Sequence, residues 1–299
     1  MLIQLLLYDH KSHIKPQNTL FSGIYQTKNP SYKVLLYTLP MVASAKYSTG
    51  LSGKAGLVDE TFAALRLVAN GKLEADVKAA VVVDDLLGKA THESRNAIWA
   101  KLHQRYFRDW ERAALLSKLV STSTFELGKL FVYYEFCRSE SILYDAVTQP
   151  IYSRFQAGFS GIEISDLQAW LDGIQADHPE VMDWSPQTRK KVLSNILTVI
   201  RDFCLMSGVN RKSFERVFVP ASLAGYVLYS LQESLEKFGP RTVIESPDWR
   251  LFFLDEGDVV TLLKELAHEG HCRFQKQGEI MTLELTWPNL EGYVEAVTR

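Results

Sequence analysis

Four side chains near the end of the chain are of types that bind transition metals. Glu265 and His268 stand three residues apart, as two ligands on one helix face would, and His271 and Cys272 follow closely. The spacing is not that of a His-Glu-x-x-His zinc site, and no second pair of ligands accompanies them. A histidine before Gly270 is also ordinary in the last turn of a helix, where a cation is favourable. We therefore predict no metal site and no cofactor.

A glycine-rich stretch around Lys54 has some features of a phosphate-binding loop. Lys54 is followed by Ala55 instead of Ser or Thr, the spacing of Gly50, Gly53 and Gly56 differs from that motif, and no strand precedes it. We interpret the stretch as a loop that leads into a helix. The seven histidines are scattered and form no recognisable Ser/His/Asp or Cys/His arrangement. The sequence therefore predicts no enzymatic activity and no small-molecule substrate.

Positive charge is concentrated between residues 189 and 216. The whole chain has 33 basic and 35 acidic residues and a net charge of −2, so binding to a polyanion would require a local patch. Residues 189–216 carry seven Lys and Arg against Asp202 and Glu215, a net charge of +5. Such a patch can neutralise the phosphates of a nucleic acid. Whether these cations can face a duplex together depends on the helices and strands that carry them.

A helix is expected to begin at Ser185, whose side chain can cap it, with Pro186 at the first helical position. From residue 188 to 204, apolar residues recur with helical period and define one face. Arg189 falls on that apolar face, so we expect its stem to pack there or its charge to pair with an acid. Lysines near a helix N-terminus oppose the macrodipole, which favours a role beyond a solvated surface. The polar face carries Gln187, Lys190, Lys191, Ser194, Asn195 and Arg201.

The flanking elements predict a winged helix-turn-helix around this helix. A helix over Ile142–Phe155, a strand over Gly161–Ser165 and a short helix over Asp166–Asp172 are expected before it, and a strand over Phe214–Val219 after it. In such a module the recognition helix enters the major groove and the wing contacts the backbone. A solvated helix face, or a winged helix that binds protein, is the alternative interpretation. The wing residues expected to contact DNA are Arg211, Lys212 and Arg216.

A second helix, predicted over Thr91–Trp110, opens a stripe of cations. Side chains at i, i+4, i+7 and i+11 share one helix face and can neutralise phosphates without reading bases. A solvated surface would explain the same pattern. The stripe consists of Lys101, Arg105, Arg108 and Arg112.

The chain is expected to be mainly α and to fold as several units. Residues 1–40 show no sustained period, so we expect a poorly ordered extension and take Met41 as a candidate natural start. A β-hairpin is predicted over Cys272–Trp287, with alternate residues from Met281 onward facing inward, and an extended segment over Trp249–Leu254. The predicted units are an N-terminal helical domain over 41–138, a winged-helix-like module over 139–220, and a C-terminal helix and hairpin over 221–299.

Composition predicts a cytoplasmic protein without membrane contact. The three cysteines lie far apart and are odd in number, as expected for buried thiols in a reducing compartment. No apolar run approaches the roughly 18–20 residues that cross a bilayer. Residues 255–269 carry five acidic residues against Lys264, a net charge of −4. An acidic surface of this kind suits a protein partner better than DNA.

Four short motifs together carry a resemblance to a known family. They are Lys-Tyr-Ser-Thr-Gly-Leu from Lys46, Asp59-Glu60 at the start of a helix, Ser-Pro-Gln-Thr-Arg-Lys-Lys from Ser185, and Arg-Val-Phe-Val-Pro from Arg216. From about residue 44 to the C-terminus the chain resembles BrxA, a component of bacterial BREX phage-defence systems. The resemblance implies a mostly helical, DNA-binding, non-enzymatic protein that works beside a methyltransferase, an ATPase and other BREX proteins. It assigns no binding residue.

The expected function is therefore that of a non-enzymatic BREX component that binds double-stranded DNA and has other BREX subunits as partners. The alternative is a scaffold or adaptor that docks these subunits through the winged module and the acidic C-terminal unit, without direct DNA contact. Association bridged by DNA should vanish after nuclease treatment, whereas a direct protein interface should survive it.

Overall fold

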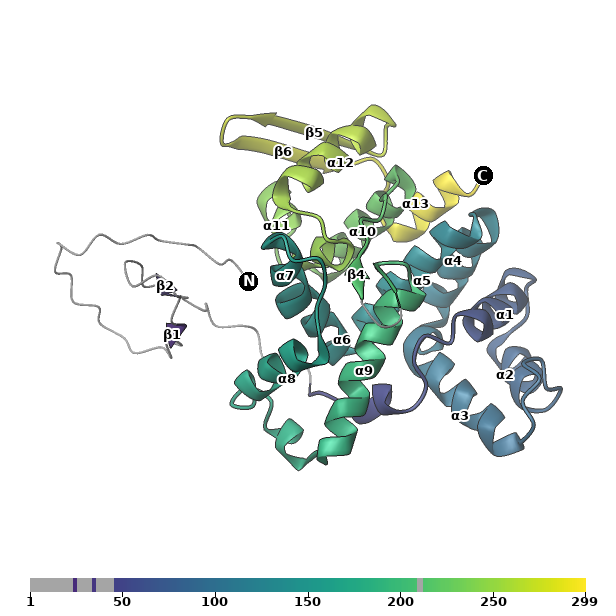
Figure 1. Ribbon diagram of the computed structural model, residues 1–299. Helices are drawn as coiled ribbons and strands as arrows, with labels where there is room; N and C mark the ends of the chain where they lie inside the picture. Colours follow the sequence, from purple (N-terminus) through teal and green to yellow (C-terminus); the bar gives the residue numbers. More distant parts are fainter. Residues whose placement is uncertain (1–23, 26–33, 36–45, 209–211) are drawn as a thin grey trace.

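The computed structural model describes residues 24–25, 34–35, 46–208 and 212–299 (Figure 1). Over these ranges the chain is mainly helical, as predicted, and its β-structure consists of two-stranded antiparallel pairs. β1 (Ile24–Tyr25) pairs with β2 (Val34–Leu35). The prediction for residues 1–40 otherwise lies outside the described residues, as does Arg211. Among the helices described, none combines the length and the hydropathy that a membrane span requires.

In the N-terminal part, α4 (Trp110–Thr122) packs against both α1 (Val58–Ala69) and the aromatic helix α5 (Phe125–Ser139). The helix predicted over Thr91–Trp110 is divided, because α3 continues into a π-helical turn and Asp109 caps a new helix by accepting from the Arg112 N–H. In α5, Phe131, Tyr133 and Phe136 are fully buried, as their aromatic density indicates. The elements are η1 (Thr49–Ser52), α1 (Val58–Ala69), α2 (Glu74–Val82), α3 (His92–Leu102), η2 (His103–Phe107), α4 (Trp110–Thr122) and α5 (Phe125–Ser139).

The middle part contains the helix that was expected to carry the DNA-binding face. Ser185 accepts a hydrogen bond from the Thr188 N–H and Pro186 is the first residue of α9, as predicted. The predicted strand over Gly161–Ser165 is wrong, because α8 already begins at Ile164. The elements are α6 (Ser141–Ala146), η3 (Val147–Ile151), α7 (Tyr152–Gln156), α8 (Ile164–Gly173), η4 (Pro179–Asp183), α9 (Pro186–Asp202), β3 (Met206–Ser207) and β4 (Ser213–Phe214).

The short strand β4 lies between β3 and the segment that precedes α8. Successive N–H groups of a strand point to opposite edges, and the Phe214 N–H donates to the Ser160 carbonyl at 2.8 Å while the Glu215 N–H donates to the Leu205 carbonyl at 3.0 Å. The strand predicted over Phe214–Val219 is thus limited to its first residue, and α10 begins just after Pro220. The hairpin is held closely, because a Cβ atom at Gly161 would lie 2.1 Å from the carbonyl oxygen of Lys212.

The C-terminal part contains the predicted hairpin. β5 pairs with β6 from Cys272↔Leu285 to Gln277↔Ile280, and half-buried residues alternate with exposed ones from Met281 to Trp287, as predicted. The extended segment predicted over 249–254 is instead mostly 3-10 helix. The elements are α10 (Ala221–Ser234), α11 (Pro240–Ile244), η5 (Pro247–Phe252), α12 (Glu256–His268), β5 (Cys272–Gln277), β6 (Ile280–Leu285) and α13 (Leu290–Val297).

Buried side chains connect the three parts. The hydroxyl groups of Tyr134 in α5 and Tyr144 in α6 both donate to the carboxylate of Asp248 in η5, at 2.5 and 2.6 Å. The Tyr133 hydroxyl donates to the Leu251 carbonyl. The predicted boundaries at residues 139 and 220 remain predictions, and hydrogen bonds of the core cross both positions.

Candidate nucleic-acid interface

The exposed face of α9 carries two lysines that form no ion pair with the residues described by the structure. Lys190 and Lys191 are exposed, and neither has a carboxylate within 4 Å among the residues that the structure describes. Gln187 is exposed beside them, and Ser194 is half-buried one turn further along. Arg201 lies near the end of the helix and pairs with Asp202 at 3.4 Å. The polar face therefore extends along the whole helix, with its unpaired charge at the N-terminal end.

Arg189 pairs with an acid, which was one of the two outcomes expected for it. Its Nη1 lies 3.6 Å from Oδ1 of Asp172 in α8, and its Nη2 donates to the Met182 carbonyl. This arginine holds α8 and η4 against α9 and is not part of the exposed face.

Residues 46–56, which we call the strap, lie along one edge of the α9 face. The side chain of Asn195 donates from Nδ2 to the Leu51 carbonyl, and a Cβ atom at Gly56 would lie 2.9 Å from Oδ2 of Asp202. Asn195 is thus half-buried and its amide nitrogen is engaged by the strap, and its predicted contact with DNA remains a prediction. Periodicity placed it on the polar side of the helix, and that edge is covered by the strap.

Tyr47 anchors the beginning of the strap. Its hydroxyl donates to Asp145 and its N–H to Glu180, both at 2.6 Å, and its ring stacks on His178 with centroids 3.6 Å apart. Burial raises the pKa of Tyr47, and the neighbouring carboxylate of Asp145 adds to this. The tyrosine of the Tyr-Ser-Thr-Gly motif therefore attaches the strap to α6 and to η4.

The strap also contacts the second basic helix. A Cβ atom at Gly50 would lie 3.1 Å from Oε1 of Glu140 and 3.3 Å from Nζ of Lys101. Glu140 accepts hydrogen bonds from Gln104 at 3.1 Å and from Ser48 at 3.4 Å. Burial raises the pKa of Glu140, while the nearby cations oppose this shift. Since Gly50 lies beside Lys101 and Leu51 bonds to α9, the strap makes the two predicted basic faces neighbours.

Two arginines of the predicted stripe do not face solvent. Arg105 is buried over the Phe136 ring and donates to the carbonyls of Lys54 and Ala55 in the strap, at 2.9 and 2.7 Å. Arg112 pairs with Glu135 at 2.7 Å and with Glu233 at 2.9 Å. The π-helical turn changes the helical phase and Asp109 starts a new helix, so the i, i+4, i+7, i+11 spacing does not define one face.

The other two members of the stripe stay accessible. Lys101 is half-buried beside the strap and Arg108 is exposed; within the described part of the chain neither has a carboxylate within 4 Å. Lys54 of the strap is also exposed. Sequence reasoning missed Lys54 as a cation of this surface, because the strap was interpreted only as a loop leading into a helix.

The hairpin contributes Lys212 and Arg216. Burial lowers the pKa of Lys212, and the positive charge of Arg201 acts in the same direction. The guanidinium of Arg216 is exposed and lies 5.5 Å from the centroid of the Phe155 ring in α7. Lys212 therefore lies near the C-terminal end of the α9 face, while Arg216 faces α7.

Two of the four residues considered as metal ligands contact other groups of the protein. His271 lies 3.5 Å from Glu269, and Sγ of Cys272 points to the Leu263 carbonyl at 3.7 Å; burial raises the pKa of this thiol to about 11. In the described ranges no group of three or more His, Cys, Asp or Glu could hold a metal ion. Cys204 is exposed, contrary to the expectation of buried thiols, and lies 2.9 Å from Nζ of Lys129.

A model of the BrxA family matches residues 45–228, more than half of the chain. The chain belongs to the BrxA family. Membership implies a role in BREX phage defence. The range that matches BrxA begins at the strap, includes both basic helices and the hairpin, and ends within α10.

Two solved structures share the fold of this BrxA-family chain. The crystal structure of an uncharacterized protein from Magnetospirillum magneticum has a TM-score of 0.56 and 13% identity, over 70% of this chain and 100% of that chain. The magnesium ion-bound SspB crystal structure has a TM-score of 0.52 and 15% identity, over 84% of this chain and 96% of that chain. At such low identity the likeness shows the fold alone. No curated protein matches the chain.

Proposed function

We propose that this BrxA-family protein is a non-enzymatic component of BREX defence that binds double-stranded DNA through the exposed face of α9. In this proposal β3, β4 and the Ser160 segment form the wing of a winged helix, and Lys190 and Lys191 approach the duplex first. The observation that carries the proposal is that these two lysines are exposed and have no carboxylate near them within the described residues. An unpaired lysine on a rigid helix can neutralise a phosphate without first breaking an ion pair.

The accessible cations around α9 support a contact broader than one helix. The strap places Lys101 and Lys54 on the side of Asn195, and the hairpin places Lys212 near Arg201. The DNA-contacting set that we propose consists of Gln187, Lys190, Lys191, Ser194, Arg201, Lys212 and Arg216, with Lys54, Lys101 and Arg108 as additional phosphate contacts.

Charge reversal on α9 tests the proposal. We expect Lys190→Glu with Lys191→Glu to weaken binding to duplex DNA at least tenfold and to flatten the slope of log affinity against log salt by about 0.9 for each lost phosphate contact. The matched control is Lys72→Glu with Lys78→Glu, the same change of charge at exposed positions of the α2 region. Equal affinities of the two double variants in a fluorescence anisotropy titration would refute the assignment of α9.

A pull-down separates DNA binding from the scaffold alternative. If the protein meets other BREX subunits through DNA, nuclease treatment should release them, and the α9 double variant should fail to retain them. If the subunits stay bound after nuclease treatment and the α9 variant retains them equally, the scaffold function is favoured.

A further inference from the structure

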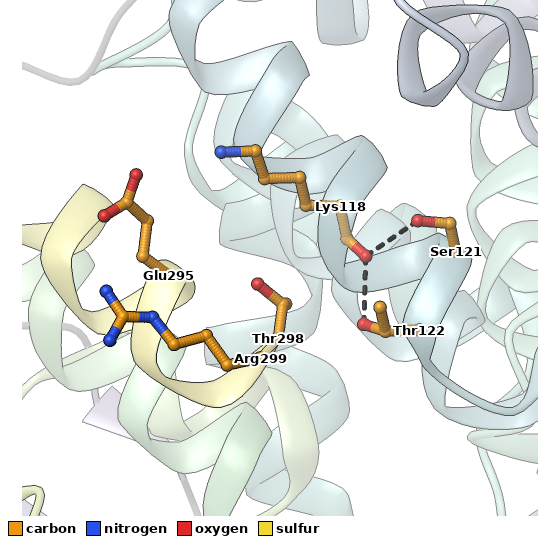
Figure 2. A pocket seen from close by; sticks show the side chains of 6 residues that line it. All are labelled: Lys118, Ser121, Thr122, Glu295, Thr298 and Arg299. Atoms are coloured by element: carbon orange, nitrogen blue, oxygen red, sulfur yellow. Dashed lines mark hydrogen bonds between the residues drawn. The ribbon is translucent and has the colours of Figure 1, made fainter.

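Two hollows lie on either side of the C-terminal half of α4. One, of about 340 Å³, lies between α1 and α4, with Phe62, Leu65 and Val120 among its lining. The other, of about 400 Å³, lies between α4 and α13 and is polar (Figure 2). Ser121 lines both hollows, so the end of α4 forms a ridge between them. We call this region the α4 surface.

The floor of the first hollow is apolar in part, because Ser117, Ser121 and Ser123 line it together with the apolar residues, and its edge is aromatic. Phe125 is 44% exposed at this edge, and its ring lies 4.7 Å from that of Phe62. A large apolar side chain exposed beside an open hollow is a feature of sites that receive an apolar side chain from a partner.

The residues around the hollows carry more positive than negative charge, with Arg66, Lys118 and Arg299 against Glu295. Arg66 is exposed at the first hollow and Lys118 at the second; among the described residues neither has a carboxylate within 4 Å. Figure 2 shows the Lys118 ammonium extending from α4, while the hydroxyls of Ser121 and Thr122 donate back to the Lys118 carbonyl. Nζ of Lys129 lies 5.3 Å from the centroid of the Phe125 ring. An apolar floor with this rim complements a segment that combines an apolar side chain with carboxylates.

The two hollows of the α4 surface lie away from the N-terminal end of α9, which carries Lys190 and Lys191. In Figure 1, α9 begins at the lower edge of the molecule, whereas α4 ends beside α13 at the upper right. The Lys129 edge of the surface is nearer to the other end of α9, because Nζ of Lys129 donates to Sγ of Cys204 at 2.9 Å.

We propose that the α4 surface docks an acidic amphipathic segment of a partner protein. A large apolar side chain of the segment enters the hollow between α1 and α4, and carboxylates of the segment pair with Arg66 and Lys118. This is the arrangement by which an amphipathic helix binds a hydrophobic groove with a charged rim. The site is separate from α9 and does not depend on DNA binding.

The test uses a fluorescein-labelled helical peptide with Leu and Phe on one face and Glu on the other, and a second peptide with Lys in place of Glu. By fluorescence anisotropy, the protein should bind the Glu peptide saturably and the Lys peptide at least tenfold more weakly. Arg66→Glu with Lys118→Glu should weaken binding of the Glu peptide at least tenfold, and Phe125→Ala should weaken it severalfold. Circular dichroism verifies that each variant is folded.

The control is again Lys72→Glu with Lys78→Glu, which changes the net charge equally at another place. The proposal is overturned if the wild-type protein does not bind the Glu peptide, if it binds both peptides equally, or if the control variant loses as much affinity as the Arg66/Lys118 variant. Duplex DNA binding by the Arg66/Lys118 variant should be unchanged, so this result is independent of the test of α9.

Discussion

Two arginines that lie close together in the sequence have different environments, which the residue type alone does not indicate. Arg105 is buried and bonds to two carbonyls of the strap, whereas Arg108, three residues later, is exposed. A buried guanidinium that satisfies backbone carbonyls stabilises the fold, and an exposed one is free to meet a phosphate. Arg105 is therefore expected to contribute to the stability of the fold, and Arg108 to binding.

Replacing Arg105 by alanine should mainly lower stability, and replacing Arg108 by alanine should mainly weaken DNA binding. Arg105→Ala removes two charge-assisted hydrogen bonds, so we expect the free energy of unfolding to fall by about 3 kcal/mol. Arg108→Ala should change it by less than about 0.5 kcal/mol and should weaken DNA binding at low salt. Urea denaturation and a DNA titration measure both effects. An unstable Arg108→Ala variant and an unaffected Arg105→Ala variant would contradict the assigned environments.

A substitution at Gly161 tests the close contact between this residue and the hairpin. A methyl group there would lie 2.1 Å from the Lys212 carbonyl oxygen, so Gly161→Ala has to displace the hairpin. We expect a loss of about 1–3 kcal/mol, as for other overpacked sites, together with weaker DNA binding because Lys212 moves. Gly173→Ala in α8 is the matched control, since its added methyl group meets no atom of the described residues within 4 Å. Equal thermal melting of both variants would refute the close approach.

At the scale of elements, the strap determines how much of α9 is available. It covers the Asn195 edge of the helix, is anchored by Tyr47, and passes beside Glu140 and Lys101. The face that remains open is narrower than the polar face expected from helical period. The strap contacts Lys101 of α3 on one side and Asn195 of α9 on the other, so it covers part of the proposed DNA surface and connects it to a further cation.

The carboxyl group of Glu140 gives the strap contact a pH dependence. Burial raises its pKa in the folded state above the unfolded value of about 4.5, so the folded protein holds the proton more tightly. Stability from this group is therefore present below pH 4.5 and is lost as the pH rises through the folded pKa. We expect Glu140→Gln to melt at or above the wild-type temperature at pH 7 and to show no such gain at pH 4.

Thermal melts of the wild-type protein and Glu140→Gln across pH 4–8 measure this difference. A variant that is less stable than the wild type at pH 7 would show that attraction to Lys101 and Arg105 outweighs the cost of burying the charge.

At the scale of the whole molecule, the core joins the parts that the sequence suggested as separate domains. Arg112 of α4 bonds to Glu135 of α5 and to Ser230 and Glu233 of α10, and Tyr226 of α10 also donates to Glu135. The Arg112 guanidinium lowers the pKa of Glu135 against the opposing effect of burial. We expect the region around this network to unfold in one cooperative transition.

Arg112→Ala should strongly destabilise the network around Glu135. It leaves the buried carboxylate of Glu135 without its cation, which typically costs about 3–5 kcal/mol. Glu233→Ala removes only the partly exposed partner and should cost at most about 1 kcal/mol. Differential scanning calorimetry measures both losses. Two separated transitions in the wild-type protein would instead support independent domains with boundaries near 139 and 220.

Local sequence patterns were sufficient to predict much of the secondary structure and the fold class. The cap at Ser185, the helical period of α9, the hairpin from Cys272 and the mainly α class all depend on neighbouring residues, and the structure agrees with each. The four motifs that resemble BrxA lie in or beside the range that matches the family. Capping, period and turn chemistry act over a few residues, so they can be inferred from the chain alone.

Tertiary structure decided which polar residues are free. The Asn195 amide, the Arg105 guanidinium and the Arg112 guanidinium each bond to groups between 23 and 144 positions away in the chain, and no local pattern indicates these partners. Lys190 and Lys191 carry the same kind of signal in the sequence, yet they stay exposed. Availability depends on what packs over a side chain, and that is determined by contacts between distant segments.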